Sequence, residues 1–181
     1  MIGGSLGAVQ ALRELLPQLP ADYRLPVIIV LHQYRHNGES CGRLLAEHCA
    51  LPVCTIEDKA PILPGQIYVA PANYHVLIER ARSFALSIEP PVNFARPAID
   101  VTFETAADVY GARLVGVLLS GASADGALGL RCIKDAGGAT FCQLPSDSAE
   151  GTMPRAGCAA TAVDRIGSPQ SLGRQLLEFC P

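Results

Sequence analysis

Two continuous apolar runs, at residues 27–31 and 114–119, constrain the fold of this chain more than any other feature. The first run reads Val-Ile-Ile-Val-Leu and is rich in β-branched residues. A strand that is apolar at every position is typical of a parallel sheet, because helices cover both faces of such a sheet. Polar and glycine residues follow each run, and a helical pattern of apolar residues comes next. The sequence therefore predicts an α/β fold around a mainly parallel sheet.

Shorter segments continue this alternation of strands and helices. Further strands are expected at 52–56, 67–70, 139–143 and 160–163, and helices at 8–16, 40–49, 97–110, 128–136 and 168–179. Residues 76–79 and 84–88 have the pattern of an antiparallel hairpin that turns at 80–83. No repeat and no linker divides the sequence. We therefore expect one doubly wound, three-layer domain over residues 1–181, with the hairpin added to it.

Composition excludes several classes of function. The chain has 181 residues, of which 49% are hydrophobic and 17% charged, as expected for a core-rich globular protein. The net charge of −3 and the lack of a basic stripe argue against nucleic acid as a partner. The apolar runs are too short to insert into a membrane, and no signal peptide precedes them. The seven cysteines form no Cys-x-x-Cys pair and are interpreted as reduced, mostly buried thiols of a cytoplasmic protein.

The first seven residues contain the pattern Gly-x-Ser-x-Gly, formed by Gly3, Ser5 and Gly7. A serine between glycines ahead of a helix indicates a nucleophile on a tight strand-to-helix turn. The free N–H groups of the helix start could face a developing oxyanion. An anion-binding turn is an equally good interpretation of this pattern taken alone. Only Met1 and Ile2 precede the turn, so the strand that should position the serine is expected to be truncated.

Three polar residues follow predicted strands: Ser5, His32 and Asp125. Sites in open parallel sheets form beyond the carboxyl ends of the strands, so the three side chains could meet at one edge. A serine needs a base to take its proton, and a carboxylate can orient a histidine for that role. The alternatives are a structural histidine, and an aspartate that caps the following helix. A zinc site at His32 and His36 lacks further ligands, so no metal or cofactor is expected.

Several separated segments resemble the catalytic domain of the chemotaxis protein-glutamate methylesterases, the CheB type. The resemblance extends almost from end to end, and its motifs lie in the same order. The residues that carry it are Gly3-Gly4-Ser5-Leu6-Gly7-Ala8, the strand ending in His32, the block from Leu63 to Pro71, Pro91-Val92-Asn93 with Arg96-Pro97, Gly121 through Gly126, and Met153-Pro154-Arg155. The resemblance implies a doubly wound α/β domain with an added hairpin. It also implies hydrolysis of glutamate γ-methyl esters on the cytoplasmic helices of chemoreceptors, with release of methanol, and in some members deamidation of glutamine.

The resemblance assigns roles to particular residues. Ser5 is implied to be the nucleophile, His32 the general base and Asp125 the acid that orients it. The backbone N–H groups near Leu6 and Ala122 are implied to be the oxyanion donors. Four more residues lie in motif blocks near the expected edge and either shape a substrate groove or support the structure: Asn73, His75, Arg96 and Met153.

The sequence also departs from the family pattern. Ala122, Ser123 and Ala124 stand where the family usually has Met, Gly and Asn, and the loss of that Asn is expected to loosen the loop of Asp125. Leu6 replaces a usual small residue, and the usual N-terminal receiver domain is absent from this sequence. Two alternatives to the methylesterase therefore stay open. One is a degenerate, non-catalytic binding module of the same fold, and the other is a small-molecule esterase or amidase with the same three residues.

Overall fold

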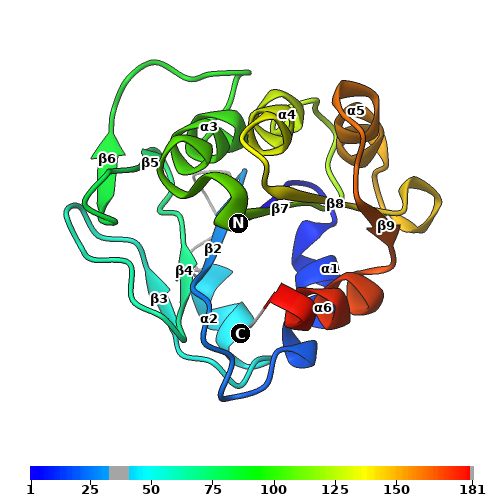
Figure 1. The fold of residues 1–181 in the computed structure, drawn as a ribbon, viewed down its shortest axis with the longest axis horizontal. Helices are drawn as coiled ribbons and strands as arrows, with labels where there is room; N and C mark the ends of the chain where they lie inside the picture. Colours follow the sequence, from blue (N-terminus) through cyan, green and yellow to red (C-terminus); the bar gives the residue numbers. More distant parts are fainter. Residues whose placement is uncertain (33–40, 180–181) are drawn as a thin grey trace.

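The computed structural model describes residues 1–32 and 41–179, which form a central sheet between two layers of helices (Figure 1). Seven strands lie in the order β3-β4-β2-β1-β7-β8-β9, and every neighbouring pair is parallel. Their bounds are β1 Ile2–Gly4, β2 Val27–Leu31, β3 Val53–Thr55, β4 Ile67–Val69, β7 Val115–Leu118, β8 Ala139–Gln143 and β9 Arg165–Gly167. Strands β2, β4 and β3 lie on one side of β1 and strands β7, β8 and β9 on the other, so the strand order reverses at β1. Such a reversal is where open parallel sheets bind ligands.

Helices cover both faces of this sheet, as Figure 1 shows. Helices α1 (Ala8–Leu15), α2 (Cys41–Ala46) and α6 (Pro169–Leu176) lie on one face. Helices α3 (Ile99–Tyr110), α4 (Ala127–Asp135) and α5 (Thr152–Ala160) lie on the other. Short 3-10 turns η1 (Leu16–Gln18), η2 (Gly111–Arg113), η3 (Pro145–Asp147) and η4 (Leu177–Phe179) complete the order. The predicted doubly wound fold is confirmed, and the sheet is wholly parallel.

The apolar run of β2 shows why the sequence folds in this way. All five residues of the strand are buried. Ile29 and Leu31 pack into the core cluster beneath α1 and α6, whereas Ile28 and Val30 pack into the cluster beneath α3 and α4. Alternate side chains of a strand point to opposite faces, so a strand covered on both sides must be apolar throughout.

The glycines of the first turn allow contacts that any side chain would prevent. A Cβ at Gly3 would lie 2.5 Å from Ile99 Cγ2, and one at Gly4 would lie 2.4 Å from Ala8 Cβ. Gly7 has φ of 84° and precedes α1 as its N-cap. This left-handed conformation is costly for residues with a Cβ. The tight strand-to-helix turn predicted around Ser5 is therefore present.

The predicted antiparallel hairpin is also present, apart from the main sheet. Strands β5 (His75–Ile78) and β6 (Phe84–Ser87) pair with each other, and His75 lies opposite Ser87. The hairpin packs against α3, where the Ile78 N–H donates to Thr105 Oγ1 at 3.1 Å. It therefore supports the outer side of α3.

Three predictions about local structure need correction. No strand forms at 160–163, because α5 continues to Ala160 and the last strand is β9 at Arg165–Gly167. The helix predicted at 97–110 begins at Ile99, and the helix predicted at 40–49 ends at Ala46.

Of the five cysteines whose side chains the structure describes, all are free thiols but only Cys142 is fully buried. In the described ranges, no helix is both long enough and apolar enough to cross a bilayer.

Candidate active site

Ser5, His32 and Asp125 lie at the carboxyl ends of the three central strands. Ser5 directly follows β1, and its N–H donates to the Ser120 carbonyl beyond β7 at 2.9 Å. His32 directly follows β2, and its N–H donates to the Gly4 carbonyl at 3.2 Å. The backbone of Ser5 is therefore bonded to one neighbouring strand end, and that of His32 to the residue before Ser5. Ser5 and His32 therefore lie where the strand order reverses, at β1.

The His32 ring is paired with the Asp125 carboxylate. Nε2 of His32 lies 2.7 Å from Oδ2 of Asp125. The His32 side chain is 15% exposed and the Asp125 side chain is fully buried. In the neutral ring, Nε2 then carries the hydrogen that faces Asp125, and the other nitrogen, Nδ1, can accept a proton. Within the described residues, the Ser5 hydroxyl makes no hydrogen bond to His32, and such contacts are often long in a site without substrate.

The Asp125 carboxylate caps α3 rather than the helix that follows it. Oδ2 accepts the Ile99 N–H at 2.7 Å, and Oδ1 accepts the Asp100 N–H at 3.2 Å. The N-cap of α4 is Gly126, without a side-chain hydrogen bond. The local interpretation of Asp125 as the cap of its own helix is therefore wrong. The sequence could not show this, because the partner helix begins 26 residues earlier.

The environment of Asp125 favours its ionised form. Burial opposes the charge, but hydrogen bonds from His32, Asn93 and the α3 amides outweigh burial and lower the pKa of Asp125. The positive end of the α3 dipole acts in the same direction. An ionised Asp125 can hold the His32 ring and stabilise it when it becomes protonated.

Asn93 is a site residue that sequence reasoning did not assign. Its Nδ2 donates to Asp125 Oδ1 at 2.9 Å, across 32 residues of sequence. The residue lies in the loop before α3 and has a positive φ of 53°. Its place in the block Pro91-Val92-Asn93 was the available signal. Asn93 adds a fourth donor to the carboxylate and fixes its second oxygen.

Two backbone amides near Ser5 are unbonded among the described residues, those of Leu6 and Ala122. Both residues are exposed, Leu6 to 65%. Gly121, next to Ala122 in the loop after β7, allows this loop to approach Ser5, since a Cβ at Gly121 would lie only 3.0 Å from Ser5 Cβ. The loop that carries Gly121 and Ala122 therefore lies against the turn that carries Ser5.

The turn that carries Ser5 is also bonded to Ser120. Its side chain is buried, and Oγ donates to the Leu6 carbonyl at 2.7 Å and accepts the Glu150 N–H at 2.9 Å. Met153 is fully buried on the same side, where its N–H donates to the Gly121 carbonyl at 2.8 Å. A Cβ at Gly121 would lie 2.7 Å from Met153 Cε, so Met153 packs beneath the site.

Three other predicted groove residues organise the loop ahead of α3. Nδ1 of His75 accepts the Ala98 N–H at 3.2 Å, which leaves Nε2 to donate to the Pro90 carbonyl at 3.1 Å. Nη1 of Arg96 donates to the carbonyls of Ile88 and Glu89 at 2.6 and 3.0 Å. The N–H of Asn73 donates to the Arg96 carbonyl at 3.2 Å. For His75 and Arg96 these contacts favour structural support over contact with substrate.

Comparison with known proteins shows the family of this chain. The family model described as CheB methylesterase matches residues 1–176. A Leptospira interrogans protein, provisionally named protein-glutamate methylesterase/protein-glutamine glutaminase, is 42% identical over 179 residues, which are 99% of this chain and 93% of that protein. The protein-glutamate methylesterase/protein-glutamine glutaminase 2 of Anaeromyxobacter dehalogenans is 38% identical over 99% of this chain. This chain spans only 52% of that relative, and about half of several others.

A solved structure gives the same result. The Thermotoga maritima CheB methylesterase catalytic domain superposes with a TM-score of 0.93 at 26% identity, over 98% of this chain and 96% of that one. The blocks quoted from the sequence, the doubly wound fold and the family model all agree. This chain belongs to the CheB methylesterase family.

Proposed function

We propose that this chain is a serine hydrolase that cleaves γ-methyl esters of glutamate on chemoreceptor helices and releases methanol. The observation that carries the proposal is the His32–Asp125 pair, on the strand end next to the one that Ser5 follows, where the strand order reverses. Family membership and the names of the relatives support the substrate. Receptor helices of this kind face the cytoplasm, so the proposed reaction takes place there.

In the first step, Ser5 Oγ attacks the ester carbonyl carbon and gives its proton to His32. We assign Nδ1 as the accepting atom, because Nε2 faces Asp125. Asp125 holds the ring in place and stabilises the imidazolium without becoming protonated itself. A serine hydroxyl is a weak nucleophile without such a base, so the pair supplies the activation.

Charge then develops on the carbonyl oxygen of the tetrahedral intermediate. The free N–H groups of Leu6 and Ala122 are the proposed donors to this oxyanion. Both belong to the backbone, so the replacement of the usual family residues at these positions leaves the donors in place. One such donor typically contributes about 10²–10³ to the rate.

Collapse of the intermediate expels methanol, which takes the proton from His32. The product is an ester between the Ser5 Oγ and the glutamate side chain. Water then attacks this acyl-enzyme, with His32 again as the base, and releases the glutamate carboxylate and free Ser5. With a glutamine side chain the first leaving group is ammonia, in keeping with the glutaminase part of the relatives' names.

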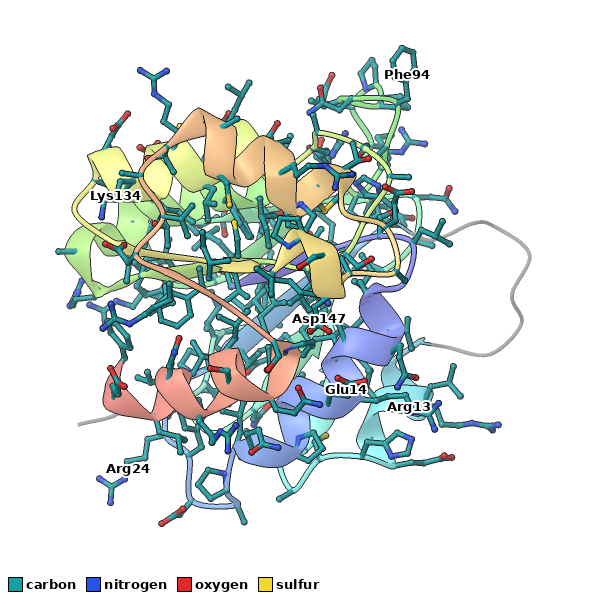
Figure 2. All side chains as sticks on the ribbon, turned by 90° about the vertical axis from the view of Figure 1, so that its right-hand side faces the viewer. Arg13, Glu14, Arg24, Phe94, Lys134 and Asp147 are labelled. Atoms are coloured by element: carbon teal, nitrogen blue, oxygen red, sulfur yellow. The ribbon has the colours of Figure 1, made fainter. Side chains whose placement is uncertain are left out.

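Exposed apolar side chains near the site favour a protein substrate over a small molecule. Leu6, next to the nucleophile, is 65% exposed. The loop that supplies Asn93 also carries Ile88, which is largely exposed, and Phe94, which is fully exposed. Figure 2 shows Phe94 pointing outward at the tip of this loop. Exposed apolar groups around a polar site are typical of protein-binding surfaces.

The non-catalytic alternative is weakened by the way Asp125 is held. The replacement of the family Asn by Ala124 predicts a loose loop. Instead, His32, Asn93 and two α3 amides bond the carboxylate, and none of these donors comes from the loop itself. Asp125 therefore stays in position without the missing Asn.

Methanol release from methylated receptor tests the proposal. The wild-type chain should release methanol and react with a fluorophosphonate probe, and Ser5→Ala should do neither while its unfolding temperature is unchanged. Ser146→Ala, at an exposed serine of η3, is the matched control and should retain both properties. Wild-type turnover by Ser5→Ala would end the proposal. Probe labelling without methanol release would support the small-molecule esterase instead.

A further inference from the structure

A second buried carboxylate lies behind Asp125 and is bonded to it through one amide. Asp100, in the first turn of α3, is 4% exposed, and Asp125 is 1% exposed. Nδ2 of Asn93 donates to Asp100 Oδ2 at 2.8 Å and to Asp125 Oδ1 at 2.9 Å. The two hydrogens of one amide group thus bridge the two acids.

The N-termini of α3 and α4 are linked by these two carboxylates, each of which accepts backbone N–H groups of the other helix. Asp125, just before α4, accepts the first amides of α3. Asp100, at the start of α3, accepts the Gly129 N–H of α4 at 2.7 Å. The helices approach closely because Gly129 has no side chain, and a Cβ there would lie 2.5 Å from Phe103 Cβ. A shift of Asp100 would therefore be transmitted to Asp125.

The Asp100 carboxylate supplies two acceptor oxygens to two N–H donors, those of Gly129 and Asn93. Burial raises the pKa of Asp100, and the neighbouring charge of Asp125 adds to the rise, although hydrogen bonds from Gly129 and Asn93 oppose it. An asparagine could accept the Gly129 N–H without the cost of a second buried charge, but its NH2 group would then face the Asn93 donor, and that bond would be lost. Because both Asp100 oxygens accept N–H bonds, the geometry nevertheless matches the ionised carboxylate.

The groups that face this pair leave His32 as its cationic partner. Asp100 is approached by Asp125 from the loop before α4, by Glu104 on its own helix and by the Cys132 thiol of α4. Among the described residues, no lysine or arginine forms an ion pair with Asp100 or Asp125. The positive charge that forms on His32 during catalysis is therefore the charge that Asp100 can stabilise.

We propose that Asp100 is a positioning residue of this site, which fixes Asp125 through Asn93 and stabilises the protonated His32 ring by its negative charge. The inference rests on the proposed function, since it assumes that His32 takes the Ser5 proton. It adds Asn93 and Asp100 to the site as a bonded chain behind Asp125. A carboxylate placed in advance near a developing positive charge lowers the barrier without reorganisation.

Asp100→Asn tests the inference, because it keeps the size of the side chain, removes the charge and replaces one of the two acceptor oxygens by a donor. We expect kcat to fall about tenfold with little change in KM, as the lost interaction acts in the transition state. The acidic limb of the kcat/KM profile should move to lower pH, since a negative charge is removed from the bonded chain behind the base. Asp108→Asn, at an exposed position of the same helix, should change neither value.

Two measurements separate this inference from a structural role and from failure of the proposed function. The rate of fluorophosphonate labelling should show the same shift of its acidic limb, and it needs no receptor substrate. A lower unfolding temperature with an unmoved acidic limb would make Asp100 merely structural and overturn the inference. Wild-type kcat and pH profile in Asp100→Asn would also overturn it. If Ser5→Ala is inactive in those assays, the proposed function survives that outcome.

Discussion

Asp125 accepts the backbone N–H of Ile99 at 2.7 Å, so the acid of the site is fixed by the start of a helix that lies 26 residues earlier in the chain. The carboxylate therefore serves two purposes. It caps α3, and through its contact with Nε2 it holds the His32 ring. A change at Asp125 must affect both the stability of the α3 terminus and the chemistry of the site.

Asp125→Ala should lower the rate about 10⁴-fold, because the His32 ring loses the group that orients it. It should also lower the free energy of unfolding by about 1–3 kcal/mol, since buried donors are left without an acceptor. The folded pKa of Asp125 is below its ordinary value of 3.8. Its contribution to stability is therefore complete above that value and is lost as the pH falls through the lower, folded pKa.

Chemical denaturation at a series of pH values measures this contribution. The difference in unfolding free energy between wild type and Asp125→Ala should be constant near neutral pH and should shrink in acid below about pH 4. A difference that is equally large at pH 2 and pH 7 would show that the charge of Asp125 does not contribute.

Gly121→Ala should displace Ser5, the proposed nucleophile, with little loss of stability. The new Cβ would lie 2.7 Å from Met153 Cε and 3.0 Å from Ser5 Cβ. The end of a methionine side chain can move, whereas Ser5 is held by its backbone bond to Ser120. We expect kcat to fall about 10²-fold, as misplacement of a reacting group by about 1 Å does.

The double variant Gly121→Ala/Met153→Ala is the control for this mechanism. Removal of the Met153 side chain leaves space on one side of the new methyl group, so the loop can move away from Ser5. Part of the lost kcat should return, although removal of the buried methionine side chain should lower the free energy of unfolding by about 2–5 kcal/mol. If the double variant is as slow as the single one in the same methanol assay, crowding is not the cause.

Phe94→Ser should impair the reaction with receptor but not the reaction with a small ester. The side chain is fully exposed, so its loss removes no internal contact and should leave the unfolding temperature unchanged. If Phe94 contacts the receptor helix, KM for methylated receptor should rise about tenfold while kcat/KM for p-nitrophenyl acetate stays the same.

Ile166→Ser, at a half-exposed residue of β9, is the matched control for Phe94. It should change neither KM for methylated receptor nor kcat/KM for p-nitrophenyl acetate, because β9 is the edge strand of the sheet, three strands away from β1. Equal KM values for Phe94→Ser and wild type would show that this loop tip does not contact the receptor.

The parts of the fold that sequence could predict are those whose signal is local. The apolar runs that became β2 and β7, and the glycines around Ser5, each carry their own structural reason. Strand β9 was misplaced because it has only three residues at the sheet edge and lacks a buried apolar pattern. The preceding Cys158-Ala159-Ala160 segment is apolar but belongs to α5.

The site was predictable only in part, for a similar reason. Ser5, His32 and Asp125 could be proposed because each follows a strand, and the parallel sheet places strand ends together. Asn93 reaches Asp125 across 32 residues, and the bond depends on a loop with positive φ. His75 was considered for a groove, yet it is buried between Ala98 and Pro90. Such contacts follow from how elements dock, which local patterns do not encode.

The bridged carboxylates behind the site also bear on what happens after the reaction. A glutamate methyl ester is neutral, whereas the demethylated side chain leaves as an anion. In the proposed mechanism this anion forms at Ser5, beyond the His32 ring from Asp125, and Asn93 links Asp125 to Asp100. Like charges repel, most strongly where water is scarce. The negative charges of Asp125 and Asp100 would therefore weaken binding of the glutamate product. Weak product inhibition would then follow from the same two carboxylates that hold the His32 ring.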